Sequence, residues 1–237
     1  MIQKISLIHP SRGRAQKARN VFHNWMAKRS RNIPIEYILS IDDDDTSKEQ
    51  YTNLFNDDTT IISGPNKNLV EASNRGAQLA SGDILILVSD DFDCQIHWDL
   101  TILKAVEGRS GYVLKTWDGI QKWMVTLPIM DREYYNNQGY IYHPGYKHLF
   151  ADTEMTHKAA VENALIIRND IYFKHEHPST GACTHDEINA KADTTWKQGE
   201  EFYLERVKAK FGLGDHVDPL NLGPEFQQLV GWLKTKI

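Results

Sequence analysis

The sequence has few cysteines, no long apolar run and no basic excess. Two cysteines, Cys94 and Cys183, in 237 residues are too few for a disulfide framework, so we expect free thiols in a reducing compartment. No run of about 18 apolar residues occurs, so no transmembrane segment is expected. The N-terminal MIQKISLIHP is interrupted too early to be a signal peptide. These absences predict a cytoplasmic protein.

Charge and composition exclude further classes. The chain has 27 basic and 32 acidic residues and a net charge of -5. Sequence-independent binding of nucleic acid needs a basic face, so we expect no nucleic-acid partner. With 41% hydrophobic and 25% charged residues, the chain has the balance of an ordinary globular protein rather than a disordered one. Its length suits a single domain.

The first ninety residues alternate between strand-like and helix-like patterns. Strands are predicted at 4–9, 33–41, 59–64 and 83–88, and helices at 15–31 and 68–80. This order predicts an α/β fold with a mostly parallel central sheet and helices on both faces. The segment 83–88 is almost wholly apolar, as expected for a central strand covered on both faces.

The second half is less regular. Helices are predicted at 98–107, 153–164 and 193–210, and strands at 111–117, 122–130 and 164–169. The segment 131–150, rich in Tyr, Gly, Asn and His, is predicted to be a structured loop region. From Pro219 to Ile237 the apolar residues follow the spacing of an amphipathic helix.

Acidic residues follow two of the predicted strands. Residues 42–45 are four aspartates, and Ser89-Asp90-Asp91-Phe92-Asp93 follows the apolar strand. Ligands of open α/β sheets bind at the carboxyl ends of the strands, where adjacent carboxylates need a cation or hydrogen-bond donors to offset their repulsion. Asp91 and Asp93 point to the same side of an extended chain. The pattern favours a site for Mg²⁺ or Mn²⁺ with substrate phosphates; solvated turn residues are the alternative.

These motifs, in this order, resemble the nucleotide-binding half of GT-A fold glycosyltransferases, in particular glycosyltransferase family 2. The matching residues are Asn74-Arg75-Gly76, Gly82-Asp83, the apolar run ILILV and Asp91-Phe92-Asp93. The resemblance covers residues 4–99 well and the rest weakly. It implies one GT-A-like (Rossmann-like) domain over 1–237. Its expected parts are a nucleotide-sugar-binding half (1–99), an acceptor and catalytic half (100–215) and a C-terminal amphipathic helix (216–237).

The resemblance also implies a function. It suggests a metal-dependent, hexosyltransferase-like enzyme that transfers a sugar, with inversion, from a nucleotide diphosphate sugar to a glycan or other hydroxyl acceptor. A UDP-sugar is the favoured donor, and Mn²⁺ or Mg²⁺ is the expected cofactor. The implied donor-binding residues are Pro10, Ser11, Arg12, Asp42, Asp44, Asn74, Asp90 and Asp91. The alternative is a GT-A-like domain that binds a nucleotide sugar or glycan without turnover.

The metal motif has two registers, Ser89-Asp90-Asp91 and Asp91-Phe92-Asp93, and Asp91 belongs to both. We expect Asp91 and Asp93 to be metal ligands. Some GT-A enzymes close the metal site with a late histidine, and His175 and His177 are the candidates here. Alternate residues of an extended chain project one way, so both imidazoles would reach one ion. Surface or hydrogen-bonded histidines are the alternative.

The candidate base lies in HLFADTEMTHKA (148–159), which resembles the family's Glu-Asp signature. Ala151 replaces the Glu and Asp152 holds the Asp position. An inverting transfer needs one carboxylate to take the proton of the acceptor hydroxyl. Asp152 is the expected base, Glu154 the reserve and Asp118 a further option; helix capping is the alternative role of Asp152.

Two other enzyme classes fit less well. A phosphatase with an aspartate nucleophile carries its Asp-x-Asp motif on the first strand rather than the fourth. A sugar-nucleotide pyrophosphorylase needs a glycine-rich basic loop after the first strand, and SRGR has one glycine.

Overall fold

A seven-stranded sheet forms the centre of the computed structural model, which describes residues 2–55, 59–176 and 187–237. Its strands are β1 (Ile5–Pro10), β2 (Ile35–Asp42), β3 (Thr59–Gly64), β4 (Ile84–Leu87), β6 (Val113–Trp117), β7 (Ile129–Asp131) and β8 (Leu165–Tyr172). The strand order is β3-β2-β1-β4-β7-β6-β8. Only β7 runs antiparallel to its neighbours in this described sheet. The predicted α/β fold with a mostly parallel sheet is confirmed.

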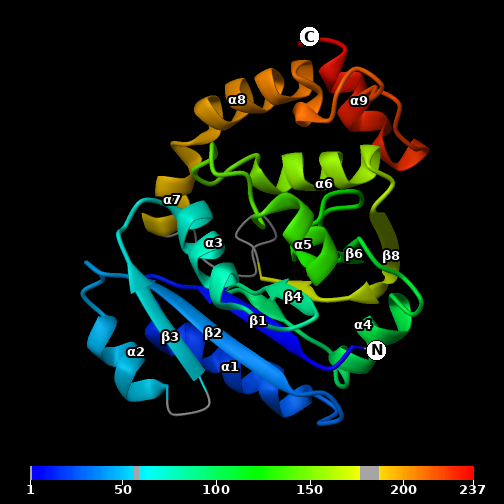
Figure 1. The fold of residues 1–237 in the computed structure, drawn as a ribbon. Helices are drawn as coiled ribbons and strands as arrows, with labels where there is room; N and C mark the ends of the chain where they lie inside the picture. Colours follow the sequence, from blue (N-terminus) through cyan, green and yellow to red (C-terminus); the bar gives the residue numbers. More distant parts are fainter. Residues whose placement is uncertain (1, 56–58, 177–186) are drawn as a thin grey trace.

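Helices cover both faces of the sheet (Figure 1). The helices of the first half are α1 (Ala15–Lys28), α2 (Lys48–Leu54), α3 (Leu69–Leu79) and α4 (Trp98–Ala105). Side chains alternate along each strand, so β1 contributes Ile5 and Leu7 to the core under α1, α2 and α4, and Ile8 to the core under α3. The helix α2 was not predicted, because only Tyr51 of its seven residues is buried.

Two glycines of the matching motif permit close packing at β1. A Cβ on Gly82 would lie 2.6 Å from the backbone nitrogen of Ser6, and one on Gly76 would lie 2.8 Å from the side chain of Ile8. The next residue, Asp83, accepts a hydrogen bond from the backbone N–H of Gln3 at 2.6 Å. These motif residues therefore join α3 and β4 to β1.

The segment predicted as a strand at 122–130 and a loop at 131–150 is built differently. Only Ile129–Asp131 form β7, and α5 (Arg132–Gln138) follows at once. Pro128 has no N–H to donate, and the Val125 N–H donates to the Thr156 hydroxyl instead of to a strand. The Asp131 carboxylate accepts from the N–H groups of Gly111 (2.7 Å) and Tyr134 (2.9 Å), which ends the strand and caps the helix.

The C-terminal part packs on α6 (Ala151–Val161) as an outer layer (Figure 1). Its elements are α8 (Trp196–Lys208), α9 (Gln227–Leu233) and the 3₁₀ turns at Lys210–Gly212 and Pro224–Phe226, whereas α7 (Glu187–Asp193) precedes this layer and lies toward α3 in Figure 1. The helix expected over 216–237 is thus shorter: 3₁₀ from Pro224 and α-helical from Gln227. None of the helices described in the three ranges is long and apolar enough to cross a membrane.

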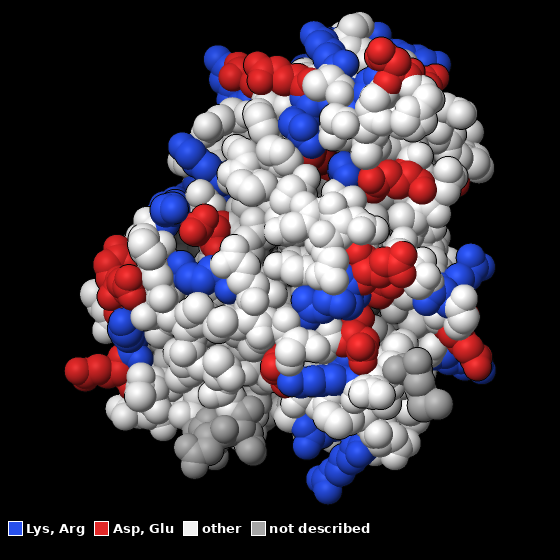
Figure 2. Space-filling view, in the orientation of Figure 1, with Lys and Arg blue, Asp and Glu red and all other residues white. Residues whose placement is uncertain are grey.

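Charged side chains of both signs are interspersed on the face in Figure 2, and uncharged surface extends between them. That face carries no continuous basic stripe of the kind that tracks a phosphate backbone.

A buried histidine links α6 to the outer layer. The Pro219 carbonyl can only accept, so His157 Nε2–H donates to it at 2.7 Å, while Nδ1 accepts from the Tyr203 hydroxyl at 2.6 Å. Burial disfavours the charged form and lowers the pKa of His157 from 6.5 to about 4.

This histidine predicts a pH dependence of stability. The His157 side chain of the unfolded chain binds a proton near pH 6.5, whereas that of the folded chain binds it only near pH 4. The contribution of neutral His157 to the free energy of unfolding is therefore fully present above pH 6.5. It is lost, by about 3 kcal/mol, as the pH falls toward 4. Urea unfolding over this range should show the loss in the parent, and His157→Gln should have a flatter profile. An equal slope in both proteins would assign the pH dependence to other groups.

Candidate functional site

The carboxyl ends of β1 and β2 bring an arginine onto two aspartates. Arg12 Nη1 donates to Asp42 at 3.1 Å and to Asp44 at 2.5 Å. Arg75, from α3, lies 3.4 Å from the other oxygen of Asp42. The hydrogen bond from Arg12 holds the pKa of the exposed Asp44 below its usual range. Three predicted donor-binding residues, Arg12, Asp42 and Asp44, are therefore brought together, with their charges compensated.

A buried hydrogen-bond network fixes the Asp90 carboxylate. A carboxylate only accepts, so His9 Nε2–H donates to Asp90 at 3.0 Å and His9 Nδ1 accepts from the Tyr37 hydroxyl. The Ser11 hydroxyl also donates to Asp90, at 3.0 Å, and is itself 2.8 Å from the Tyr51 hydroxyl. Pro10 is buried in β1 between two members of this network. The network fixes the ends of β1 and β4 against each other.

Asp91 faces an imidazole from the second half of the chain. Its Oδ2 lies 3.3 Å from His175 Nε2, and its Oδ1 accepts from the Ser89 hydroxyl. Burial opposes ionisation of Asp91, but His175 and Ser89 outweigh it and lower the pKa. Burial also disfavours the imidazolium, but Asp118 and Asp91 raise the pKa of His175 to about 9. The structure thus brings the predicted ligands Asp91 and His175 together.

A short two-stranded sheet sets the orientation of His175. The strand β5 (Phe92–Asp93) pairs antiparallel with β9 (Lys174–His175). The rings of Phe92 and His175 stack with centroids 4.3 Å apart and planes at 17°. The Glu176 N–H donates to the Asp91 carbonyl at 2.8 Å. The other predicted ligand, His177, lies outside the described residues.

Asp93 has a different environment from Asp91. Its carboxylate accepts from Lys28 Nζ at 2.6 Å and from the Asn24 amide, both on α1. Burial acts against it, but these partners lower the pKa of Asp93. Across the described ranges, no three His, Cys, Asp or Glu side chains are grouped closely enough to hold a metal ion. The described side chains alone therefore do not supply a site with three protein ligands.

Asp152 opens α6 and is half-buried. One of its oxygens accepts from the Thr153 N–H at 2.8 Å. Burial raises the pKa of Asp152, and attraction to His175 partly offsets the rise.

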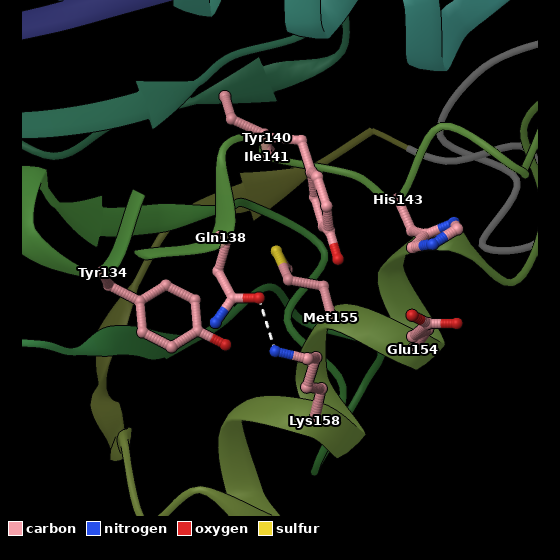
Figure 3. Close-up of a pocket in the computed structure, with 8 residues that line it drawn as sticks. All are labelled: Tyr134, Gln138, Tyr140, Ile141, His143, Glu154, Met155 and Lys158. Atoms are coloured by element: carbon pink, nitrogen blue, oxygen red, sulfur yellow. Dashed lines mark hydrogen bonds between the residues drawn. The ribbon is translucent and has the colours of Figure 1, made fainter. Parts of the chain in front are cut away.

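Glu154, two residues further along α6, is bound in an ion pair. It is 2% exposed and accepts from Arg206 Nη2 at 2.9 Å and from the Tyr146 hydroxyl at 2.7 Å. Its carboxylate borders a small pocket between α5 and α6 (Figure 3). The lining residues are Tyr134, Gln138, Tyr140, Ile141, His143, Glu154, Met155 and Lys158. Glu154 therefore joins α6 to α8, and Asp152 is the better candidate for a base.

Asn74 connects the two halves of the chain. Its side-chain oxygen accepts from the N–H groups of Ile141 (3.0 Å) and Tyr142 (3.2 Å), and its amide donates to the Tyr142 carbonyl at 2.7 Å. These bonds fix the segment that leads to Asp152. The predicted donor-binding residue thus holds the second half against α3.

Two residues near Asp91 were not foreseen in this role. Asp118 lies 3.6 Å from His175 Nδ1, and the half-buried His148 interacts electrostatically with Asp91, its pKa being lowered by burial. Asp118 directly follows a strand, so the strand-end rule that selected Asp90 and Asp91 also applies to it. We identify no comparable signal for His148.

The sequence matches no protein-family model and no curated protein. Solved structures do match. Residues 1–349 of S. aureus TarS in complex with UDP are 17% identical, with a TM-score of 0.56, covering 72% of this chain and 59% of that one. The mannosyltransferase PcManGT from Pyrobaculum calidifontis, with GDP-Man and Mn²⁺, is 11% identical, with a TM-score of 0.66, covering 99% of this chain and 70% of that one.

GalNAc-T7 with UDP, GalNAc and Mn²⁺ is 14% identical, with a TM-score of 0.60 over 73% of this chain and 44% of that one. The chain thus spans about three-fifths of the TarS fragment. These neighbours are GT-A glycosyltransferases, so the chain has the GT-A fold. They do not single out family 2.

The geometry predicts different effects for the two motif aspartates. Asp91→Asn should weaken Mn²⁺ binding in the presence of UDP at least tenfold, because it removes the carboxylate that faces His175. Asp93→Asn should change it by less than about threefold, because it leaves Asp91 and His175 intact. Mn²⁺ titration followed by electron paramagnetic resonance measures both. Equal losses in the two variants would show that Asp93 leaves Lys28 to bind the ion.

Proposed function

We propose that the protein is a metal-dependent glycosyltransferase that transfers a sugar from a nucleotide diphosphate sugar to an acceptor hydroxyl with inversion. The observation that carries the proposal is the pairing of Asp91 with His175, at 3.3 Å, beside the carboxyl end of β4. Ligands bind at this edge in open α/β sheets. The GT-A fold supports the same location.

The donor binds along the ends of β1, β2 and β4. Arg12, Asp42 and Asp44 form the part nearest the nucleoside, and the diphosphate lies toward Asp91. All three neighbouring structures named above contain a nucleoside diphosphate or its mannose derivative. A UDP-sugar is the proposed donor, with a GDP-sugar as the second choice because of PcManGT.

The metal site consists of Asp91, His175 and oxygen atoms of the donor. A carboxylate and an imidazole suit Mn²⁺ better than Mg²⁺, because Mg²⁺ prefers an all-oxygen shell. When bound, the ion offsets the negative charge that develops on the leaving diphosphate. Ser89 fixes one oxygen of Asp91 and Phe92 fixes the plane of His175. Asp93 can coordinate the same ion only if its carboxylate leaves Lys28 and Asn24.

Asp152 is the proposed general base. It accepts the proton of the acceptor hydroxyl while that oxygen bonds to the anomeric carbon and the bond from this carbon to the diphosphate breaks, which releases the nucleoside diphosphate. Burial raises the pKa of Asp152, which brings it closer to the pH at which a base works best. The Thr153 N–H holds one carboxylate oxygen in place.

The proposed function is tested with a panel of nucleotide sugars in Mn²⁺. One donor should raise the melting temperature, since a ligand that binds the folded state stabilises it. The same donor should release its nucleoside diphosphate, slowly in water and faster with a screened sugar acceptor. Chelation with EDTA should stop release. Tight binding without release for every donor and acceptor would favour the non-catalytic alternative.

The base predicts a specific loss of rate. Asp152→Asn keeps the size of the side chain and its hydrogen bond from Thr153. The melting temperature should therefore stay near that of the parent, and the donor affinity should change by less than twofold. Transfer should fall by about 10² to 10⁴, the usual contribution of general-base catalysis. Asp152→Glu, which keeps a carboxylate, should recover part of the lost transfer rate.

Glu154→Gln serves as the contrasting variant. It weakens the buried contact with Arg206, so its melting temperature should fall, while the folded fraction keeps most of its kcat. A larger loss of kcat in Glu154→Gln than in Asp152→Asn would exchange the two roles.

A further inference from the structure

We infer that Asp118 is a positioning residue that orients His175 for the metal ion; this inference rests on the proposed function. Asp118 is 2% exposed and immediately follows β6. Among the described residues, the printed contact that links its carboxylate to the proposed donor site is the one with His175, so its role there is indirect.

The backbone first brings the two residues together. After β8 the chain continues along the end of β6: the Phe173 N–H donates to the Trp117 carbonyl at 2.9 Å, and the His175 N–H to the Asp118 carbonyl at 3.1 Å. The next N–H, of Glu176, donates to the Asp91 carbonyl. His175 is therefore held between Asp118 on one side and Asp91 on the other.

The carboxylate of Asp118 is itself fixed. Its Oδ1 accepts from the N–H groups of Ile120 (2.8 Å) and Gln121 (2.6 Å), and its Oδ2 accepts from the Thr126 hydroxyl at 2.7 Å. Buried Lys115 donates to the Gln121 carbonyl at 2.7 Å and so anchors the same turn. These bonds leave Asp118 little freedom to move away from His175.

The two ring nitrogens of His175 face different acids. Nδ1 lies 3.6 Å from Asp118 Oδ2, and Nε2 lies 3.3 Å from Asp91 Oδ2. An ion bound at Asp91 would replace the proton on Nε2, and the Asp118 carboxylate would then favour the remaining proton on Nδ1, so that the lone pair of the neutral ring lies on the side of Asp91. Metal-binding histidines commonly have such a carboxylate on the ring nitrogen that does not bind the ion, and its loss costs about 10- to 100-fold in metal affinity.

The test measures Mn²⁺ affinity in the presence of UDP by electron paramagnetic resonance. Asp118→Asn keeps a side-chain oxygen for the N–H groups of Ile120 and Gln121 but removes the charge beside Nδ1. Mn²⁺ affinity should fall about 10- to 100-fold, while UDP binding in EDTA and the melting temperature stay near those of the parent. The matched control is Asp170→Asn, the same change at an exposed position of β8, which should have no effect.

A double-mutant cycle separates positioning from general support of the fold. If Asp118 acts through His175, Asp118→Asn should cause no further loss of affinity in a His175→Ala background. An equal loss with and without His175 would overturn the inference. Unchanged affinity in Asp118→Asn alone would overturn it too.

A second readout does not depend on the metal. Nitrogen-15 spectra of the metal-free protein at alkaline pH, recorded in an Asp91→Asn background that removes the competing carboxylate at Nε2, should show the proton mainly on Nδ1 when Asp118 is present and mainly on Nε2 after Asp118→Asn. The same tautomer in both would overturn the inference. If the Asp91→Asn protein shows the expected tautomer and shift but the parent binds no Mn²⁺ with UDP or GDP, the metal part of the proposed function fails and the orientation of His175 by Asp118 stands.

Discussion

Compensation of negative charge at one edge of the sheet is the constraint on which the candidate site depends. Carboxylates that follow neighbouring strands repel one another, and their partial burial is unfavourable unless each has a donor or cation. In the described residues each has a partner, taken from a different element. The pairs are Asp42 with Arg12 and Arg75, Asp90 with His9 and Ser11, Asp91 with Ser89 and His175, and Asp93 with Lys28 and Asn24. The acidic motif therefore organises its surroundings before any ligand binds.

The same requirement joins the two halves of the chain. Asp91 receives its imidazole from β9, and β9 lies there because it pairs with β5. Asn74 holds the segment before α6 through three hydrogen bonds. The donor edge is therefore completed by residues far away in sequence.

The sequence predicted β1 to β4, α1 and α3 well because each combines a clear periodicity with clear stop residues. It also selected Asp91 as a candidate, because acids after an apolar strand are readily recognised. It did not predict α5, which begins where the Asp131 carboxylate binds distant N–H groups. It assigned Asp91 and Asp93 the same role and ranked Asp152 above Glu154 only by the resemblance of the motif, because Lys28 and Arg206 become neighbours of Asp93 and Glu154 only in the folded chain.

The attachment of α6 to the C-terminal layer has a consequence for synthesis. The helix that carries Asp152 is secured by Tyr203 and Arg206 of α8 and by the Pro219 carbonyl. Strands β1 to β4 leave the ribosome before these partners, because synthesis proceeds from the N-terminus at about 5 to 20 residues per second. A nascent chain therefore has β1 to β4 outside the ribosome before the residues that secure α6 and Asp152 have been synthesised, so this helix gains its final contacts later than the sheet.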